Sequence, residues 1–308
     1  MEIVVFGAGS LGSLIGGLLA REHDVILVGR DPHVRTVREE GLTVTGAYEF
    51  RVHPDVTTDG TGLAADLVIV TVKSFDTAEA ARELATGSFE AVLSLQNGLE
   101  NERVLAERLE RVLAGTVTYG ARLREPGLVA CTGEGEIALG PPEGGESPPT
   151  ERIAAAFRAA DVKATAVEDV PRRLWLKLAI NAGINPVTAL ARVRNGALVD
   201  GPGRETARAA TLEAARVARA EDVGLTDREA LSALDSVIDA TGENRSSMLQ
   251  DVEAGRRTEV DAINGAVVRS AADSAIDAPT NRHLLRLVRT WERGRDGREN
   301  ASGGAADR

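Results

Sequence analysis

The hydrophobic positions in the first half of the chain fall in short continuous runs rather than in strict alternation. Such runs are typical of parallel strands whose two faces are both covered. They lie at residues 1–6, 24–30, 65–73 and 90–95. Segments with a helical pattern follow them, at residues 7–23, 75–85 and 100–110. This order predicts βαβ units in a doubly wound parallel sheet.

Shorter elements complete the first half. Residues 41–46 and 49–56 have the pattern of a brief β excursion, and the stretch 115–140 contains further strands. A Pro/Gly-rich loop at 140–151 leads to a helix at 150–160 and a last strand at 162–168. We therefore expect one α/β domain over residues 1–169.

Beyond Val170 the strand pattern stops and helical periodicity replaces it. The expected helices cover residues 171–191, 202–222, 227–241, 246–254, 258–273 and 279–293. A second, all-helical domain is thus predicted over residues 170–293. The polar, glycine-rich remainder, residues 294–308, is predicted to be a disordered tail.

Composition narrows the functional classes. A net charge of −11 over 308 residues argues against a nucleic acid or an anionic membrane surface as partner. The single cysteine, Cys131, excludes an internal disulfide, and the four histidines lack the spacing of metal ligands. The N-terminal apolar run has no basic leader and is broken by glycines, which predicts neither a signal peptide nor a membrane span. We expect a cytoplasmic protein without a metal site.

A glycine-rich turn follows the first strand. In "GAGSLG", Gly7, Gly9 and Gly12 have G-x-G-x-x-G spacing between a predicted strand and a predicted helix. Gly7 allows the tight turn, Gly9 lets the backbone approach a pyrophosphate, and Gly12 allows close packing of helix on sheet. The anion would be bound at the helix N-terminus. The pattern favours a Rossmann-type dinucleotide site over a glycine-rich turn without a ligand.

The end of the second strand bears on the choice of dinucleotide. A free ribose 2′-hydroxyl is usually met by an acidic residue there, whereas this strand ends in "VGRD" with Arg30 at the critical position. Arginine suits a 2′-phosphate and favours NADP(H), while the adjacent Asp31 leaves NAD(H) open. Lys73, just past the third strand, is either a cofactor contact or a solvated cation at a strand end.

A polar stripe runs along the predicted helix at 171–191. Lys177, Asn181 and Asn185 are spaced at i, i+4 and i+8, so a helix places them on one face over roughly 12 Å. A lysine on an apolar helix is often a residue whose charged end reaches the surface. Two asparagines in a helix interior are unfavourable, however, and indicate a stripe that meets a ligand. The length fits a small molecule.

The motifs "GAGSLG", "VKS", "SLQNG", "WLKLAINAGINPVTAL", "RNGAL", "ENRSSMLQD" and "GRRTEVDAINGAVV" occur in the order found in one family. Together they resemble ketopantoate reductase (2-dehydropantoate 2-reductase) over about residues 1–290. The C-terminal motifs are the specific part, because many dehydrogenases share the glycine fingerprint. The resemblance implies NADPH-dependent reduction of 2-dehydropantoate to (R)-pantoate, on the route to pantothenate and coenzyme A.

The resemblance also implies roles for individual residues. The family's catalytic lysine corresponds to Lys177, and its glutamate corresponds to Glu259, which we assign to both catalysis and cofactor binding. The remaining cofactor contacts are Gly7, Ala8, Gly9, Ser10, Leu11, Gly12, Arg30, Lys73, Asn97 and Ala121. The substrate contacts are Asn97, Lys177, Asn181, Asn185, Asn195, Asn244 and Ser247. Hydride arriving at a ketone carbon leaves negative charge on oxygen, which an ammonium such as that of Lys177 can stabilise and protonate.

Structural roles compete with several of these assignments. Asn97-Gly98 is also a turn sequence, and Asn195-Gly196 could be a helix C-cap. Glu259 lies in "TEVD", which is a good capping box, and Asn185-Pro186 could kink or end its helix. At the level of function, a reductase of another 2-keto acid or an opine-type substrate remains open, as does an NADP(H)-binding sensor. The oligomeric state is also open, and a homodimer is compatible with the sequence.

Overall fold

The computed structural model describes residues 1–303, with side chains described up to residue 295. It divides into two compact units, which are described separately below. The first unit is Met1–Arg173, and the second begins at Leu174. The sequence pattern places this division after residue 169.

The first unit is built on an eight-stranded sheet with the order β12-β11-β8-β7-β6-β1-β2-β5. Its strands are β1 (Glu2–Phe6), β2 (Asp24–Val28), β5 (Asp55–Thr57), β6 (Ala64–Val70), β7 (Ser88–Ser94), β8 (Val112–Val117), β11 (Ile137–Gly140) and β12 (Ala164–Ala166). Neighbouring strands are parallel except β8 and β11. The chain winds one way from β1 to β2 and the other way to β6, so the strand order reverses at β1. The predicted doubly wound α/β fold is confirmed.

Both faces of this sheet are buried. The helices of the first unit are α1 (Ser10–Leu19), α2 (His33–Glu40), α3 (Thr77–Leu84), α4 (Asn101–Ala106) and α5 (Pro148–Ala159), with a 3₁₀ turn η1 at Ser74–Asp76. Ile3 and Val5 of β1 belong to the core that α1 and α5 cover. Val4 and Phe6 belong to the core that α3 and α4 cover. Burial on both sides explains why the strand sequences are continuously apolar.

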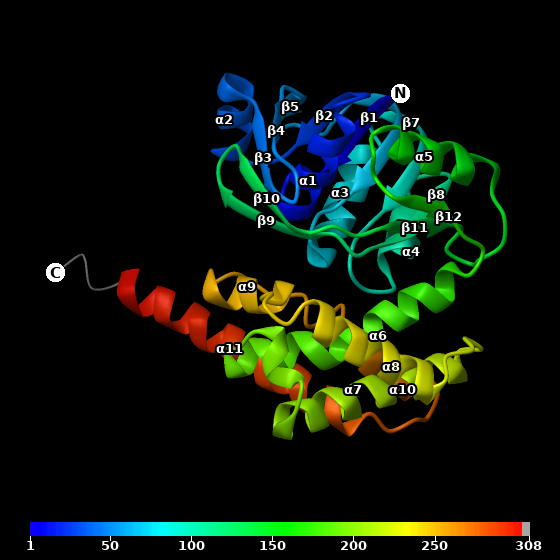
Figure 1. Ribbon diagram of the computed structural model, residues 1–308, viewed down its shortest axis with the longest axis vertical. Helices are drawn as coiled ribbons and strands as arrows, with labels where there is room; N and C mark the ends of the chain where they lie inside the picture. The colour runs from blue at the N-terminus through cyan, green and yellow to red at the C-terminus, as the bar shows by residue number, and fades with distance from the viewer. Residues whose placement is uncertain (304–308) are drawn as a thin grey trace. The chain divides into compact units, whose positions relative to one another are not determined.

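A second sheet of four strands, in the order β4-β3-β10-β9, completes the first unit. Its strands are β3 (Leu42–Gly46), β4 (Phe50–Val52), β9 (Gly120–Glu125) and β10 (Leu128–Gly133). The sequence pattern indicates these strands but not that β3 and β10 pair in parallel. Figure 1 shows the blue and green strands side by side near α1. The Leu123 amide of β9 donates to the Ser10 hydroxyl of α1 at 3.0 Å.

Helix α2 is absent from the sequence prediction, and its buried residue His33 anchors it. The Nδ1 atom of His33 accepts the Gly127 amide proton at 3.0 Å. The ring proton therefore lies on Nε2, which faces the Ser13 hydroxyl at 3.0 Å. Burial lowers the pKa of His33. The neutral imidazole joins α2 to α1 and to the turn between β9 and β10.

The His33 contacts predict a pH-dependent stability. Below pH 6.5, the ordinary pKa of histidine, His33 becomes protonated in the unfolded chain but stays neutral in the folded protein. The free energy of unfolding should therefore fall as the pH drops from 6.5 toward the lowered folded pKa, and be level above 6.5. Urea titrations across this range should show a shallower slope for His33→Leu, which is also about 1–3 kcal/mol less stable at pH 8. The control is His283→Gln, which replaces an exposed histidine and should keep the wild-type slope. If His33→Leu also kept the wild-type slope, this role of His33 would be refuted.

The second unit is helical throughout its described part. Its helices are α6 (Val170–Ala191, which starts in the first unit), α7 (Gly201–Ala220), α8 (Asp227–Ala240), α9 (Ser247–Glu253), α10 (Asn264–Asp273) and α11 (Pro279–Gly303), with a 3₁₀ turn η2 at Asn195–Leu198. Their shared core includes Ile184 of α6, Ala210 of α7, Ile238 of α8 and Leu284 of α11. The predicted all-helical C-terminal region is confirmed.

Two predicted helix ends are wrong. The helix expected from residue 258 begins only at Asn264. The Thr258 amide donates to the Glu292 carboxylate of α11 at 2.7 Å instead of to a side chain of its own segment, and the Thr258 hydroxyl accepts from the Val260 amide at 3.3 Å instead of from that of Asp261. The predicted capping box is therefore not formed. At the other end, α11 continues to Gly303 rather than stopping at 293, and Arg295 donates to the Gly255 carbonyl at 2.8 Å. Residues 304–308 of the predicted tail lie outside the described residues.

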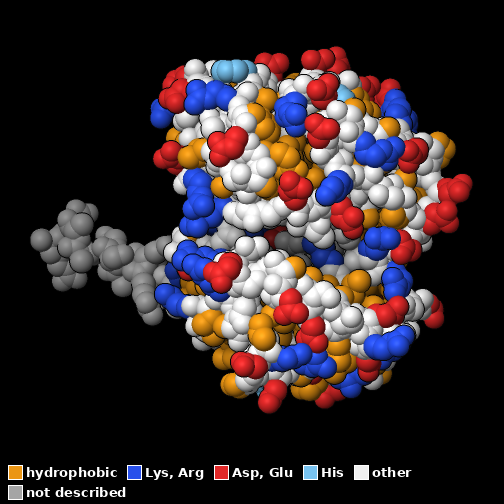
Figure 2. Space-filling view, in the orientation of Figure 1, with side chains coloured by type: hydrophobic (Ala, Val, Ile, Leu, Met, Phe, Trp, Pro, Cys, Tyr) orange, Lys and Arg blue, Asp and Glu red, His pale blue; other side chains and the backbone are white. Residues whose placement is uncertain are grey.

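The surface carries charges of both signs. Figure 2 shows acidic and basic side chains interspersed over the visible face, with apolar side chains between them. Within residues 1–303, no helix has the length and apolar character needed to cross a membrane. In the same range, no group of three or more His, Cys, Asp or Glu side chains is arranged to bind a metal ion.

Candidate active site

The glycine loop after β1 has the geometry of a dinucleotide cradle. Gly7 has a φ of +116°, and a Cβ there would lie 2.7 Å from the Val72 amide nitrogen. A Cβ on Gly12 would lie 2.2 Å from the Gly7 carbonyl oxygen. These two glycines are therefore required by the fold itself. Thr71, which sequence reasoning missed, stabilises the turn by donating its hydroxyl to the Gly7 carbonyl at 2.9 Å.

Gly9 differs from its two neighbours in the motif. A Cβ at Gly9 would meet only the Gly7 carbonyl oxygen, at 4.0 Å, which is ordinary contact. The protein itself therefore leaves room for a side chain at the residue that precedes α1. Space at a helix N-terminus with its amides directed outward is what a phosphate group requires. The residues present fit a dinucleotide.

The other loop residues have structural contacts of their own. The Gly7 and Ala8 amides both donate to the Val28 carbonyl at the end of β2, at 3.0 and 2.8 Å. Leu11 packs against the core under α1, while Ser10 accepts from β9 as described above. The loop is thus hydrogen-bonded to β2, and the first residue of α1 is hydrogen-bonded to β9.

Arg30 and Asp31 point to different partners after β2. The Arg30 side chain is 87% exposed and lies 3.3 Å from the Asp76 carboxylate. The Asp31 carboxylate accepts the Arg35 amide proton in the first turn of α2, at 3.2 Å. Arg30 is therefore available for an anion, whereas Asp31 stabilises the start of α2.

Lys73 and Asn97 follow the next two strands of the sheet. Lys73 precedes the 3₁₀ turn after β6, and Asn97 follows β7. The Asn97 carbonyl accepts from the Asn101 side chain at 2.8 Å, and Gly98 has a φ of +105°. The turn predicted for Asn97-Gly98 is thus present. Lys73 and Asn97 both lie at the carboxyl edge of the sheet, where ligands of this fold bind. Ala121 lies apart from them in sequence, on β9.

The polar stripe of the second unit lies on one continuous helix. Helix α6 includes Lys177, Asn181 and Asn185, so their spacing places the three side chains on one face. Lys177 and Asn181 are half-buried, and Asn185 is buried. The side-chain amide of Asn181 has no hydrogen-bond partner among the side chains and backbone groups of residues 1–295.

Helix α9 brings a second set of polar groups to α6. The side-chain amide of Asn185 donates to the Ser247 hydroxyl at 3.4 Å, a long hydrogen bond. One residue earlier, Ser246 accepts the Leu249 amide proton at the start of α9 and contacts the Thr188 hydroxyl of α6 at 2.7 Å. Ser246 is thus the residue that docks α9, and it leaves Ser247 beside Asn185.

Asn195 and Asn244 meet through their backbones. The Asn195 amide donates to the Asn244 carbonyl at 3.1 Å, and the Asn195 side chain donates to the Thr241 hydroxyl at 2.9 Å. Next to them, a Cβ on Gly196 would lie 2.9 Å from the Gly242 carbonyl. The Asn195-Gly196 pair therefore serves close backbone packing rather than a helix C-cap. The Asn195 side-chain oxygen is buried and lacks a protein partner among the described residues.

Pro186 does not end α6, which continues to Ala191. A proline has no amide proton, so it leaves the carbonyl four residues earlier, that of Ala182, without its helical donor. A buried carbonyl in that state costs about 1–3 kcal/mol. The side chain of Asn264 supplies the donor, at 3.1 Å. A proline inside a predicted helix is the sequence signal that the carbonyl four residues earlier needs another donor.

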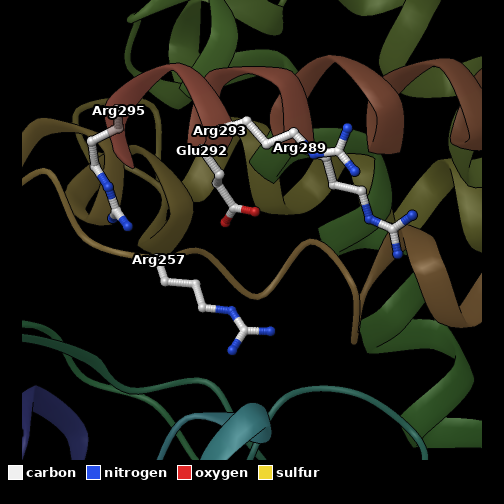
Figure 3. A pocket seen from close by; sticks show the side chains of 5 residues that line it. All are labelled: Arg257, Arg289, Glu292, Arg293 and Arg295. Atoms are coloured by element: carbon white, nitrogen blue, oxygen red, sulfur yellow. The ribbon is translucent and has the colours of Figure 1, made fainter. Parts of the chain in front are cut away.

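Glu259 is buried in the segment between α9 and α10. This segment borders a pocket of about 230 Å3 at the side of α11 (Figure 3). The pocket is lined by Arg257, Arg289, Glu292, Arg293 and Arg295.

The charged groups of this pocket fix the segment that carries Glu259. Glu292 accepts from Thr258, as noted above, and Arg289 donates to the Asp261 carboxylate at 2.7 Å. Two side chains of α11 thus bind the residues on either side of Glu259. Glu292 and Arg289 thus have a structural role, which is to hold this segment against α11.

Comparisons with known proteins agree with this arrangement. The family model "Ketopantoate reductase PanE/ApbA" matches residues 3–144, and "Ketopantoate reductase PanE/ApbA C terminal" matches residues 169–292. The two matches together cover most of the chain. The chain belongs to the ketopantoate reductase family.

Curated relatives of this ketopantoate reductase family member extend over nearly its whole length. A 2-dehydropantoate 2-reductase of Halobacterium salinarum is 44% identical over 95% of this chain and 99% of its own. One of Archaeoglobus fulgidus is 41% identical over 95% and 98%.

Solved structures show the same fold. A PanE/ApbA family ketopantoate reductase from Ralstonia eutropha JMP134 has a TM-score of 0.88 at 35% identity, over 96% of this chain and 100% of its own. A D-mandelate dehydrogenase solved with NADH and anilino(oxo)acetate has a TM-score of 0.90 at 24% identity, over 96% and 99%. At that identity it is evidence for the fold alone.

Proposed function

We propose that this chain reduces 2-dehydropantoate to (R)-pantoate with NADPH. The observation that supports this most directly is the Lys177, Asn181 and Asn185 stripe on α6, with Ser247 hydrogen-bonded to its end. The nicotinamide supplies a hydride to the C2 carbonyl carbon when it is bound. The family membership and the curated relatives described above support the same substrate.

In this proposal Lys177 is the general acid. The C2 carbonyl oxygen gains negative charge as the carbon accepts the hydride. The Lys177 ammonium would stabilise that charge and donate a proton to the oxygen. One hydride and one proton convert the ketone to the alcohol, and the lysine is reprotonated from solvent. Glu259, buried and braced by α11, is proposed to support this step and to contact the cofactor.

The asparagines are proposed to bind the rest of the substrate. A neutral amide can donate to a carboxylate and accept from a hydroxyl, and 2-dehydropantoate has both groups. Asn181, whose side-chain amide has no protein partner among the described residues, and Asn185 suit these contacts. Ser247 can donate or accept at the far end. Asn195 and Asn244 complete the set, and Asn97 is proposed to contact both substrate and cofactor.

The experiment that tests the activity uses purified protein and 2-dehydropantoate. NADPH and NADH are supplied in parallel, and loss of nicotinamide absorbance is followed. We expect turnover with NADPH and much lower kcat/KM for pyruvate and 2-ketoisovalerate. Comparable rates with those two keto acids would replace the substrate assignment by a broader 2-keto acid reductase.

The preference for NADPH rests on Arg30. Its guanidinium is exposed, and its single ion pair with Asp76 is of the solvated kind that contributes little. A 2′-phosphate could therefore take over this contact, while the Asp31 carboxylate that would favour NADH is bound to the start of α2. The remaining proposed cofactor contacts, Lys73, Asn97 and Ala121, lie on the loops and strand described above.

Arg30→Ala should therefore raise the NADPH dissociation constant on the order of tenfold and leave that for NADH nearly unchanged. Titrating nicotinamide fluorescence with each cofactor measures both values. Arg35→Ala, a nearby exposed arginine on α2, is the matched control and should change neither. Equal losses for the two cofactors in Arg30→Ala would show that Arg30 does not read the 2′-phosphate.

A further inference from the structure

The amide of Asn264 is fully buried, and its orientation is determined by its neighbours. The backbone amides of Thr280 and Asn281 can only donate, and both donate to the Glu213 carboxylate at 2.9 Å. The Asn281 side-chain nitrogen donates to the same carboxylate at 2.9 Å. The Asn281 oxygen is thereby left to accept, and it accepts from the Asn264 nitrogen at 2.9 Å.

This chain of contacts aims a donor at α6. With its oxygen turned away, the Asn264 nitrogen directs its second proton to the Ala182 carbonyl at 3.1 Å. That carbonyl is the one deprived of a helical donor by Pro186. The Asn264 oxygen has no partner within the described residues, so the donor function is the one that the fold uses.

The carbonyl lies inside the polar stripe. Ala182 follows Asn181 directly, and Pro186 follows Asn185, so the contact of Asn264 fixes the turn of α6 that separates the two asparagines. We propose that Asn264 is a positioning residue for the substrate. It replaces the donor that Pro186 removes and thereby sets the directions of Asn181 and Asn185. This inference rests on the proposed function, since it assigns these asparagines to the substrate.

The first variant is Asn264→Ala. We expect the KM for 2-dehydropantoate to rise on the order of tenfold and kcat to fall less, because the substrate contacts are misdirected. The NADPH dissociation constant should stay within about twofold, because the cofactor contacts of the first unit are not altered. A purely structural role would lower the thermal midpoint and leave KM unchanged, and that result would overturn the proposal.

Thr211→Val is the matched control. The Thr211 hydroxyl is also fully buried and donates to a carbonyl of α6, that of Ala179, at 3.1 Å. Ala179 has a second donor available in the amide of Gly183, four residues on. We expect a lower thermal midpoint with unchanged KM. An equal rise of KM in Thr211→Val would show that any loosening of α6 has this effect, and it would refute a specific role for Asn264.

Pro186→Ala tests the mechanism directly. The substitution restores a backbone amide proton that can donate to the Ala182 carbonyl, so the contact of Asn264 with α6 becomes dispensable in this background. The double variant Pro186→Ala/Asn264→Ala should have nearly the KM of Pro186→Ala alone. The double variant should be more stable than Asn264→Ala, although both lack the contact with Asn281. If Asn264→Ala raises KM as much in the Pro186→Ala background as in the wild-type background, or if the double variant is no more stable than Asn264→Ala, the proposal is contradicted.

Failure of the proposed function can be told apart from failure of this inference. A wild-type protein without 2-dehydropantoate turnover counts against the function only. Hydrogen exchange of the α6 amides then replaces KM as the measurement. Asn264→Ala should accelerate exchange between residues 181 and 187 when Pro186 is present and leave it unchanged in the Pro186→Ala background. Equal acceleration in both backgrounds would refute the inference.

Discussion

Lys177→Ala should bind NADPH normally and lose turnover by a factor of about 10²–10⁴. The lysine lies on α6 and is not among the residues proposed to bind the cofactor, so cofactor affinity should not depend on it. The alkoxide formed by hydride transfer then has neither an ammonium to stabilise it nor a positioned proton donor. Steady-state kinetics and a fluorescence titration of NADPH on the same sample measure the two quantities.

Lys177→Arg distinguishes charge from proton transfer. Arginine keeps the positive charge but does not give up its proton at the pH of the assay, so turnover should remain low. The control is Lys163→Ala, which removes the exposed lysine near Glu134 and should leave kcat/KM unchanged. Lys177→Ala with kcat within a few-fold of wild type would eliminate Lys177 as the general acid.

The elements that the sequence predicts well are those whose pattern is determined locally. The strands around β1 are continuous apolar runs because both faces are covered, and the glycine spacing after β1 reflects steric limits within a few residues. Helix α6 is long enough for its period to be visible despite Pro186. In each case the signal lies inside the segment itself.

What the sequence misses depends on partners far along the chain. Helix α2 has few apolar positions and is anchored by His33 to groups in α1 and in the β9–β10 turn. The capping box at Thr258 is a sound local motif, but the carboxylate of Glu292 from α11 takes its donors. No local pattern reports such competition.

The same distinction applies to the candidate site. The spacing of Lys177, Asn181 and Asn185 is readable because one helix carries all three residues. Asn264 is not readable as a partner of this helix, because its contact with Ala182 joins residues far apart in the sequence. Pro186 marks where a donor is missing but not which residue provides it.

Gly9→Ala should fold like the wild type and weaken NADPH binding by roughly tenfold to a hundredfold. A methyl group at this position meets no protein atom closer than 4.0 Å, so the thermal midpoint should hardly change. It would, however, occupy the space at the start of α1 that the proposal assigns to the pyrophosphate. Scanning calorimetry and a fluorescence titration of NADPH provide the two measurements.

The other glycines of the chain supply the contrast that makes this prediction specific. Gly12→Ala places its methyl group 2.2 Å from the Gly7 carbonyl oxygen, so it should lower the thermal midpoint and reduce the yield of folded protein. Gly224→Ala, in open space between α7 and α8, should alter neither property. Because the fold has room for a methyl group at position 9, a variant that loses affinity but not stability would show that this methyl group clashes with the bound cofactor. Wild-type affinity in a folded Gly9→Ala variant would mean that the pyrophosphate does not lie at the N-terminus of α1.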